Sequence, residues 1–120
     1  MTKKVLIIEG DGNLHDQWFR GLRGKVGLKG VIALRSAMSL QEASDQFVAN
    51  PDLAAIVVGT CDTKDRLDTV PFTQDARRTF QGPMIAAVDN QFHRRRLVSA
   101  GCDHASGTRF LPRKLVEVLG

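Results

Sequence analysis

Two acidic residues, Glu9 and Asp11, are the first side chains in this sequence whose type and position could serve chemistry. They follow the apolar run 5–8, and Gly10 lies between them. Such a run, closed by polar residues, is typical of a strand buried on both faces of a parallel sheet. Ligands and reacting groups gather at the carboxyl ends of such strands, where carboxylates act as nucleophiles or hold hard cations. Glu9, Gly10 and Asp11 are therefore predicted to border a pocket.

A second polar stretch, 59–65, follows the apolar run 53–58 and carries Cys61 and Asp62. Cys61 should follow the third strand, whereas Cys102 should precede the fifth, which places the two thiols at opposite ends of the sheet. A strand of about six residues spans roughly 20 Å, against roughly 5.5 Å between the Cα atoms of a disulfide. Both cysteines are therefore predicted to be free, with Cys102 buried and Cys61 the more exposed.

The three histidines, His15, His93 and His104, fall in separate elements and lack the spacing of metal ligands. They are predicted to be surface or rim residues. The stretch Gly10-Asp11-Gly12 follows a strand and precedes a helix, as a dinucleotide-binding loop does, but the third glycine of that motif would fall at His15. The motif is too incomplete to predict a dinucleotide site.

The elements that must position these residues alternate along the chain. Apolar runs predict strands at 5–8, 31–34, 53–58, 84–88 and around Ala105. Apolar residues three and four apart predict helices that begin near residues 14, 40, 71, 91 and 112. Ser39 and Glu42 form a capping box, and Gly101 is placed for a left-handed helix cap. Asp11 or Asn13 is expected to cap the first helix, and Asp89 or Asn90 the fourth. This alternation predicts an α/β fold with a parallel sheet and a single domain, 1–120.

Four stretches give the chain a resemblance to the receiver domains of two-component response regulators, over essentially its whole length. They are Val5-Leu6-Ile7-Ile8-Glu9, Asn50-Pro51-Asp52-Leu53, Gly82-Pro83-Met84-Ile85 and Ala100-Gly101-Cys102-Asp103. The last of these looks like the Ala-Gly-Ala-Asp of the family. The resemblance implies the CheY-like, flavodoxin-like (βα)5 fold, a three-layer sandwich with the strand order 2-1-3-4-5.

Receivers carry an acidic pair after strand one, a phosphoacceptor Asp after strand three, a Thr or Ser after strand four and a Lys after strand five. The resemblance carries these roles onto Glu9 with Gly10, then Gly59, Val88 and Thr108. Four of these five positions lack the chemistry of the family. The resemblance therefore implies a degenerate pocket with no catalytic residue, and the chain is not expected to be an enzyme.

The Mg²⁺ site of the family is also depleted. Gly10 and Gly59 supply no carboxylate, so a hard cation is left with Glu9, Asp11 and water. Weak Mg²⁺ binding at Glu9 and Asp11 is the most that is expected, and no other cofactor or metal is predicted. The chain is interpreted as a pseudo-receiver, a non-catalytic interaction module of a bacterial two-component or phosphorelay pathway.

Two alternatives stay open. The first is an active receiver that is phosphorylated at a displaced acceptor, Asp62. The second is a small-ligand or nucleotide-binding α/β domain, with a close-approach pocket formed by Gly10, Gly12, Gly59 and Thr60.

Receivers commonly present the face formed by the fourth helix, fifth strand and fifth helix to partners. The resemblance places Phe92, Arg95, Arg96, Arg109 and Phe110 near that face. The run 94–96 could meet an acidic protein surface, or it could be the solvated exterior of a helix. A protein partner is predicted, and a homodimer stays open.

The formal charge of +4 and the pI near 9.5 raise the question of a nucleic-acid partner. The basic residues are spread along the chain, Arg77 and Arg78 among them, and no aromatic residues are interleaved with them. They are therefore expected to be solvated surface residues, and no nucleic-acid partner is expected. No apolar run approaches the roughly 18 residues of a membrane span, and the N-terminus lacks a signal-peptide pattern. A cytoplasmic protein without membrane contact is predicted.

Overall fold

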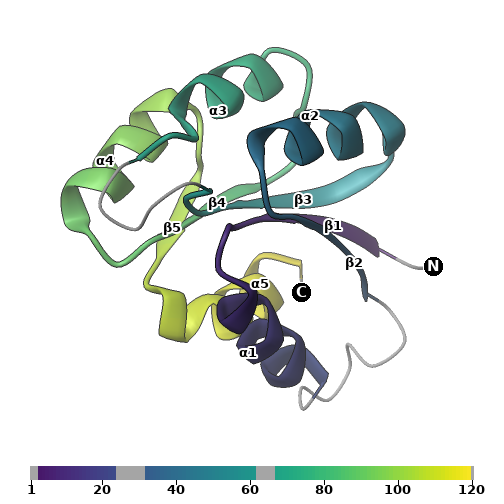
Figure 1. Ribbon diagram of the computed structural model, residues 1–120, viewed down its shortest axis with the longest axis vertical. Coiled ribbons are helices and arrows are strands. Elements are labelled where there is room, and N and C mark those ends of the chain that lie inside the picture. The colour runs from purple at the N-terminus through teal and green to yellow at the C-terminus, as the bar shows by residue number, and fades with distance from the viewer. Residues whose placement is uncertain (1–2, 24–31, 62–66, 120) are drawn as a thin grey trace.

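The computed structural model of the chain describes residues 3–23, 32–61 and 67–119 (Figure 1). The strands are β1 (Lys3–Ile8), β2 (Ile32–Ala37), β3 (Leu53–Val58), β4 (Met84–Ala87) and β5 (His104–Ser106). The helices are α1 (Gly12–Arg23), α2 (Leu40–Ala49), α3 (Val70–Arg77), α4 (Gln91–Ala100) and α5 (Leu111–Leu119), with a short 3₁₀ helix, η1 (Thr108–Phe110).

The strands form one parallel sheet in the order β2-β1-β3-β4-β5. In Figure 1, α2, α3 and α4 cover one face of this sheet, and α1 and α5 cover the other. The predicted flavodoxin-like fold and strand order are therefore confirmed. The order reverses between β1 and β3, which is the place where the carboxyl ends of a doubly wound sheet form a crevice.

Each face of the sheet has its own core. Leu6 and Ile8 of β1 belong to the core on the α2, α3 and α4 side, whereas Val5 and Ile7 belong to the core that contains Trp18 of α1. Neighbouring residues of a strand separate in this way because their side chains point to opposite faces. Strands covered on both faces need apolar residues at every position, and this requirement explains the continuous runs of β1, β3 and β4.

Short-range signals in the sequence set several helix ends. Ser39 Oγ accepts a hydrogen bond from the backbone N–H of Glu42 (3.1 Å), while the Glu42 carboxylate accepts from the N–H of Met38 (2.7 Å). The capping box therefore closes one residue before Ser39. Gly101, with φ of 142°, is the only residue with positive φ in the described part of the chain, as a left-handed cap predicts.

The strand β2 differs most from its prediction. It extends to Ala37, beyond the expected end at residue 34, and the predicted first residue, Val31, lies outside the described residues. Arg35 and Ser36 gave no apolar signal because β2 is an edge strand, which is covered less than a central strand and therefore tolerates polar side chains. The opposite edge, β5, has three residues, centred on Ala105 as predicted.

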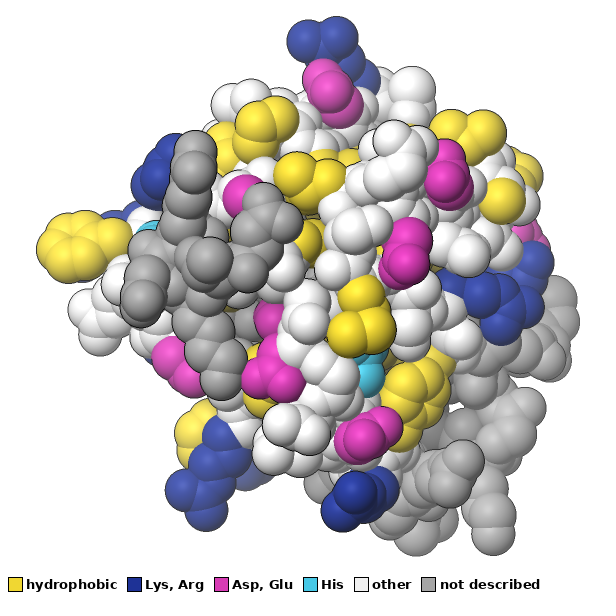
Figure 2. Space-filling model, viewed as in Figure 1, with side chains coloured by type: hydrophobic (Ala, Val, Ile, Leu, Met, Phe, Trp, Pro, Cys, Tyr) yellow, Lys and Arg dark blue, Asp and Glu magenta, His cyan; other side chains and the backbone are white. Residues whose placement is uncertain are grey.

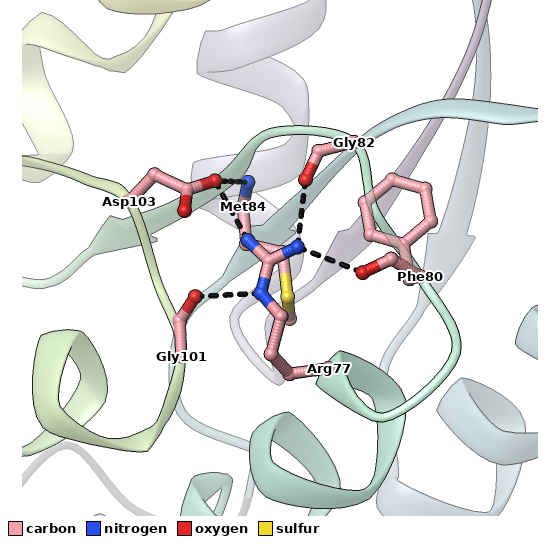
Figure 3. Close-up of polar contacts among 6 residues, drawn as sticks. All are labelled: Arg77, Phe80, Gly82, Met84, Gly101 and Asp103. Atoms are coloured by element: carbon pink, nitrogen blue, oxygen red, sulfur yellow. Dashed lines mark hydrogen bonds and ion pairs between the residues drawn. The ribbon is translucent and has the colours of Figure 1, made fainter.

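Arg77, at the end of α3, ties together three segments at the amino edge of the sheet (Figure 3). Its guanidinium donates to the backbone oxygens of Phe80 (2.8 Å), Gly82 (2.9 Å) and Gly101 (2.9 Å). Nη2 also lies 2.6 Å from Asp103 Oδ2, which accepts a second hydrogen bond from the N–H of Met84 (3.1 Å). The placement of Arg77 among scattered surface bases was therefore wrong, because its side chain is largely covered and fully engaged.

Neither Cys61 nor Cys102 forms a disulfide, as predicted. Cys102 is buried, and this burial raises the pKa of its thiol to about 12, whereas Cys61 is half-buried. Among the helices that the structure describes, none has both the length and the apolar character needed to cross a bilayer.

Candidate functional site

Glu9 lies at the centre of the carboxyl edge of the sheet, directly after β1. Its side chain is almost fully buried, with 3% exposure. Oε1 accepts a hydrogen bond from the N–H of Thr60 (3.3 Å), and Oε2 accepts from the N–H of Asp11 (3.1 Å). One carboxylate thus joins the loop after β1 to the loop after β3.

Gly59 occupies the position that the resemblance assigns to the phosphoacceptor. Its backbone is fixed, because its N–H donates to Ile8 O (2.7 Å) and its carbonyl accepts from Thr69 Oγ1 (2.7 Å). A Cβ built on Gly59 would overlap Glu9 Oε1. The Glu9 carboxylate therefore fills the space in which an aspartate side chain would begin.

Gly10 holds the second degenerate position, and the reason for its glycine is also steric. Its N–H donates to Thr60 O (2.8 Å), and a Cβ at this position would overlap the carbonyl oxygen of Cys61. The loops after β1 and β3 approach so closely that a side chain at Gly10 would push them apart. Both glycines are thus explained by packing at the same edge.

Asp11 caps α1. Its Oδ1 accepts a hydrogen bond from the N–H of Asn13 (2.9 Å), and its carbonyl accepts from the N–H of Leu14 (3.1 Å). An aspartate in this position satisfies backbone N–H groups that the first helical turn leaves unpaired. The expectation that Asp11 or Asn13 caps this helix is met by Asp11.

These residues do not fit a Mg²⁺ site. The two positions that would supply further carboxylates are glycines that the packing closes, and both Glu9 oxygens accept backbone N–H bonds. Among the described ranges, no three or more His, Cys, Asp and Glu residues gather closely enough to hold a metal ion. We therefore derive no metal-dependent step for this edge.

A cavity of about 310 Å³ opens beside Glu9. Its lining comes from the ends of β1, β3, β4 and β5 and from the first turns of α1 and α4: Glu9, Leu14, Thr60, Ala87, Val88, Asp89, Asn90, His93 and Thr108. Three predicted pocket residues, Glu9, Val88 and Thr108, thus line the same cavity, whereas Gly10, Asp11 and Gly59 do not line it. Val88 presents an isopropyl group there and is 5% exposed.

Thr108, at the position of the family's lysine, binds the loop after β4. Its N–H donates to Asp89 Oδ1 (2.8 Å), and its hydroxyl donates to Asp89 Oδ2 (2.9 Å). Its carbonyl accepts from the indole N–H of Trp18 (2.7 Å). Arg94 holds the same loop from the other side, through the carbonyls of Val88 (2.8 Å) and Asp89 (2.9 Å). Hydrogen bonds from α1, α4 and η1 thus hold the loop after β4 and Thr108 in place beside the cavity.

His15 is buried, and its prediction as a surface or rim residue was wrong. Its side chain is 5% exposed and lies edge-on to Trp18, with ring centroids 6.3 Å apart. Nε2 lies 2.7 Å from Glu9 O and must be the donor, because a carbonyl oxygen can only accept. His15 precedes Trp18 by three residues, so the helical period already placed it on the buried side of α1.

Other cavity residues escaped the sequence reasoning. Asp89 and Asn90 were weighed only as helix caps, and Asn90 does accept from the N–H groups of Phe92 (2.8 Å) and His93 (3.2 Å). Their position directly after an apolar strand was the signal that also placed them at the pocket. His93 reaches the cavity from the first turn of α4, in contrast to His104, which lies in β5.

The predicted partner residues fall into two groups. Arg109 lies over the ring of Phe110, with 5.8 Å between its Cζ and the ring centroid, and Phe110 is 58% exposed. Arg95 and Arg96 line a groove between α4 and α3, and Phe92 stands out from α4 with 72% exposure. A single face shared by both groups remains a prediction. Asp62, the predicted displaced acceptor, lies outside the described residues.

No protein-family model matches the chain, and no curated protein is significantly similar to it in sequence. A two-component response regulator from Clostridium difficile has a similar structure, with a TM-score of 0.75, 19% identity and coverage of 98% of this chain and 96% of that one. The signal receiver domain of a response regulator from Bermanella marisrubri gives a TM-score of 0.75 at 12% identity and covers 100% of both chains.

A third similar structure, a response regulator protein from Burkholderia pseudomallei, gives a TM-score of 0.77 at 15% identity and covers 98% of this chain and 66% of that one. That protein contains a phosphorylated aspartic acid, with a calcium ion and citrate. At such identities the comparisons define the fold. The chain has the fold of the CheY-like receiver domains of response regulators.

Proposed function

We propose that the chain is a pseudo-receiver, a signalling module that acts by binding a protein partner and not by accepting a phosphoryl group at the end of β3. The observation that supports this most strongly is the Glu9 carboxylate, which occupies the Cβ space of Gly59. Glycine has no side chain that could act as a nucleophile. Because the Glu9 carboxylate occupies the space beside Gly59, an aspartate could be accommodated there only if Glu9 moved. The receiver fold then serves as a scaffold for recognition.

Two further positions support the same conclusion. A phosphoryl group needs a cation and donors to hold its oxygens, and the residues at this edge do not fit Mg²⁺. Val88 has no hydroxyl, and the Thr108 hydroxyl already bonds to Asp89. Any change of state in this domain must therefore come from a ligand or partner that binds one conformation better than another.

The test is the intact mass of the protein after incubation with acetyl phosphate and Mg²⁺, beside a receiver that has its aspartate as the positive control. We expect no gain in mass. A gain of one phosphoryl group would contradict the proposal, and its loss in Asp62→Ala would identify the displaced acceptor.

A second candidate function, small-ligand binding, is favoured by the cavity itself. Its volume of about 310 Å³ lies at the lower end of the roughly 300–1,000 Å³ of small-molecule pockets. Its lining combines the apolar side chains of Leu14, Ala87 and Val88 with polar groups such as Thr60 and His93. Gly10 and Gly59 are closed by Cys61 and Glu9, so the support comes from the cavity and not from a glycine cradle. A thermal-shift screen with nucleotides and small metabolites, repeated on Val88→Phe, tests this candidate.

A further inference from the structure

A groove of about 280 Å³ opens at the amino edge of the sheet, and we call it the α2–α3 groove. Its lining comes from the end of α2 and from the segment after α3: Phe47, Asn50, Pro51, Thr79 and Phe80. Both segments directly precede strands, β3 and β4, so the groove lies at the opposite edge from the candidate functional site. Figure 2 shows hydrophobic side chains at the surface over α2. The groove is therefore separate from the pocket beside Glu9.

Aromatic rings form the apolar wall of the groove and pack on one another. Phe47 meets Phe80 edge-on, with ring centroids 6.4 Å apart, and it meets Phe72 in the same way at 6.0 Å. All three rings pack against the buried core on this side of the sheet. A Cβ at Gly82 would lie 2.7 Å from Cζ of Phe80, so the glycine allows this ring its close approach. The apolar wall is thus part of the folded core.

Asn50 brings a polar group into this apolar setting. Its side chain is 8% exposed, and its Nδ2 donates to the backbone oxygen of Gln46 (2.8 Å) and to Gln46 Oε1 (3.1 Å). A backbone carbonyl can only accept, so the nitrogen of the amide must face α2. Asn50 Oδ1 then accepts no hydrogen bond from any residue that the structure describes. A largely buried amide oxygen is left with an open acceptor position.

A donor can reach this oxygen through the groove. Among side-chain atoms of the described residues, His15 Nδ1 is the only fully enclosed nitrogen or oxygen without a partner, so Asn50 Oδ1 is accessible. Asn50 is part of the groove lining, which places the access there. Thr79 is exposed beside it, and its hydroxyl makes no hydrogen bond with the described residues. The groove thus combines aromatic walls with one buried acceptor.

None of the described residues places a charged side chain in the groove lining. Arg77 lies beside it, with Cζ 6.0 Å from the centroid of Phe80, but its guanidinium is taken up by three carbonyl oxygens and by Asp103. Asp52, which follows Pro51 in the chain, pairs with Lys4 at 3.1 Å. A charged ligand would lose its hydration here without gaining an ionic partner. The groove therefore favours a neutral ligand.

We propose that the α2–α3 groove binds a compact, neutral aromatic molecule with a hydrogen-bond donor on its ring, of the class of an indole or a phenol. The ring packs against Phe47 and Phe80, and its N–H or O–H donates to Asn50 Oδ1. The volume of about 280 Å³, just below the roughly 300–1,000 Å³ of small-molecule pockets, limits the ligand to about two rings.

A second copy of this chain does not supply such a group. The sequence contains no tyrosine, and its one tryptophan, Trp18, is 1% exposed and donates its indole N–H to Thr108 O. The exposed Phe92 and Phe110 have rings but no donor. The occupant is therefore a free small molecule, and this binding function goes beyond the pseudo-receiver function proposed above.

The test uses the full chain, ¹⁵N-labelled, titrated with indole and followed by amide NMR. Saturable shifts are expected at Phe47, Asn50, Thr79 and Phe80. Benzofuran is the matched ligand, because it keeps the shape of indole and replaces the ring N–H with an oxygen that cannot donate. It should bind at least about fivefold more weakly, since Asn50 Oδ1 then stays without a donor.

Two variants locate the site. Thr79→Phe fills the groove from an exposed position and should lower the affinity for indole at least about tenfold, whereas Ser99→Phe adds a ring at an exposed position of α4 and should leave it within about twofold. Asn50→Ala should bind indole and benzofuran equally well. If Asn50→Ala does not fold, the two ligands and the Thr79→Phe variant still decide the question.

Three results would overturn the inference: equal affinity of the unmodified chain for indole and benzofuran, equal losses in Thr79→Phe and Ser99→Phe, or shifts that cluster at Glu9, Val88 and Thr108. Tighter binding of a tryptophan-containing peptide than of indole would also overturn it, because the occupant would then be a protein partner. A phosphoryl mass gain together with indole shifts at the groove would refute the pseudo-receiver and leave this site standing.

Discussion

The two edges of the sheet are built from similar polar contacts but have different consequences. At the amino edge, one guanidinium, that of Arg77, satisfies the carbonyls of Phe80, Gly82 and Gly101 and pairs with Asp103, and no receiver chemistry is expected there. At the carboxyl edge, the Glu9 carboxylate likewise joins two loops, but it does so in the place where receivers carry their reacting groups.

The comparison shows that a single charged side chain can join neighbouring loops at either edge of the sheet. The amino edge is tied by the hydrogen bonds of Arg77 (Figure 3), and the carboxyl edge carries a cavity of about 310 Å³ beside the hydrogen bonds of Glu9. A glycine after β3 is thus compatible with an open pocket at this edge. Glu9, whose carboxylate occupies the Cβ space of Gly59, also holds together the loops after β1 and β3 beside the pocket.

The largest effect on stability should come from the amino edge. Arg77→Ala removes charged hydrogen bonds to three carbonyl oxygens and to Asp103, and we expect the free energy of unfolding to fall by about 3 kcal/mol. Urea denaturation measures this change. Arg78→Ala is the matched control, because the Arg78 side chain is 80% exposed, and it should change stability by less than about 0.5 kcal/mol. Equal effects of the two variants would show that the Arg77 cluster is not a structural tie.

The next effect concerns the acceptor position. Gly59→Ala forces the new Cβ against Glu9 Oε1 and should cost about 2 kcal/mol, as overpacking in a closed site does. In the Glu9→Ala background the cost should fall by at least half, since two of the three atoms nearest to the new Cβ belong to the Glu9 carboxylate. Gly12→Ala, whose Cβ would meet Met38 at 3.6 Å, is the control and should be nearly neutral. If the stability losses of Gly59→Ala and Glu9→Ala simply added in the double variant, the steric contact between these two residues would be refuted.

Thr108 offers a smaller test of the carboxyl edge. Thr108→Val keeps the N–H bond to Asp89 and loses the hydroxyl bond of 2.9 Å, so we expect a loss of about 1 kcal/mol in the free energy of unfolding. Thr79→Val, at an exposed position after α3, should have almost no effect. A neutral Thr108→Val would mean that the hydroxyl is free for another role at the cavity.

The smallest expected effect on stability comes from Cys102, the cysteine at the amino edge, which should also differ from Cys61 at the carboxyl edge in its reactivity. Because burial raises the pKa of Cys102 to about 12 from the ordinary 9.0, the folded protein keeps this proton above pH 9 while the unfolded chain loses it. The free energy of unfolding should therefore fall as pH rises, by less than about 1 kcal/mol between pH 8.5 and 9.5. Cys102→Ala should lose this slope. In native protein at pH 8, a thiol reagent should label Cys61 and spare Cys102, and rapid labelling of both would contradict the burial of Cys102.

Much of the fold could be predicted because the signals are local. The apolar runs of β1 and β3 reflect burial on both faces, and Gly101 marks a helix end through its backbone conformation alone. The edge strand β2 was cut short at residue 34 because Arg35 and Ser36 carry no such signal. Local periodicity could also have revealed the burial of His15, whose polar type outweighed its position.

The sequence predicted where the candidate site lies, but not the contacts between its residues. The acidic residue after β1 and the glycine after β3 located the pocket, yet the contact of Glu9 with the Cβ space of Gly59 depends on how closely two distant loops approach. The same holds for Arg77, whose acceptors lie on segments before β4 and β5. Such contacts have no counterpart in the spacing of residues along the chain.

The central claim is that the carboxyl edge no longer accepts a phosphoryl group. The most direct measurement is a comparison of amide NMR spectra of the protein with and without beryllofluoride and Mg²⁺, since this complex mimics a phosphorylated aspartate. The account predicts unchanged shifts for Glu9, Gly59, Val88 and Thr108. Saturable shifts that cluster at these residues would contradict it, because the edge would then bind the phosphoryl analogue after all.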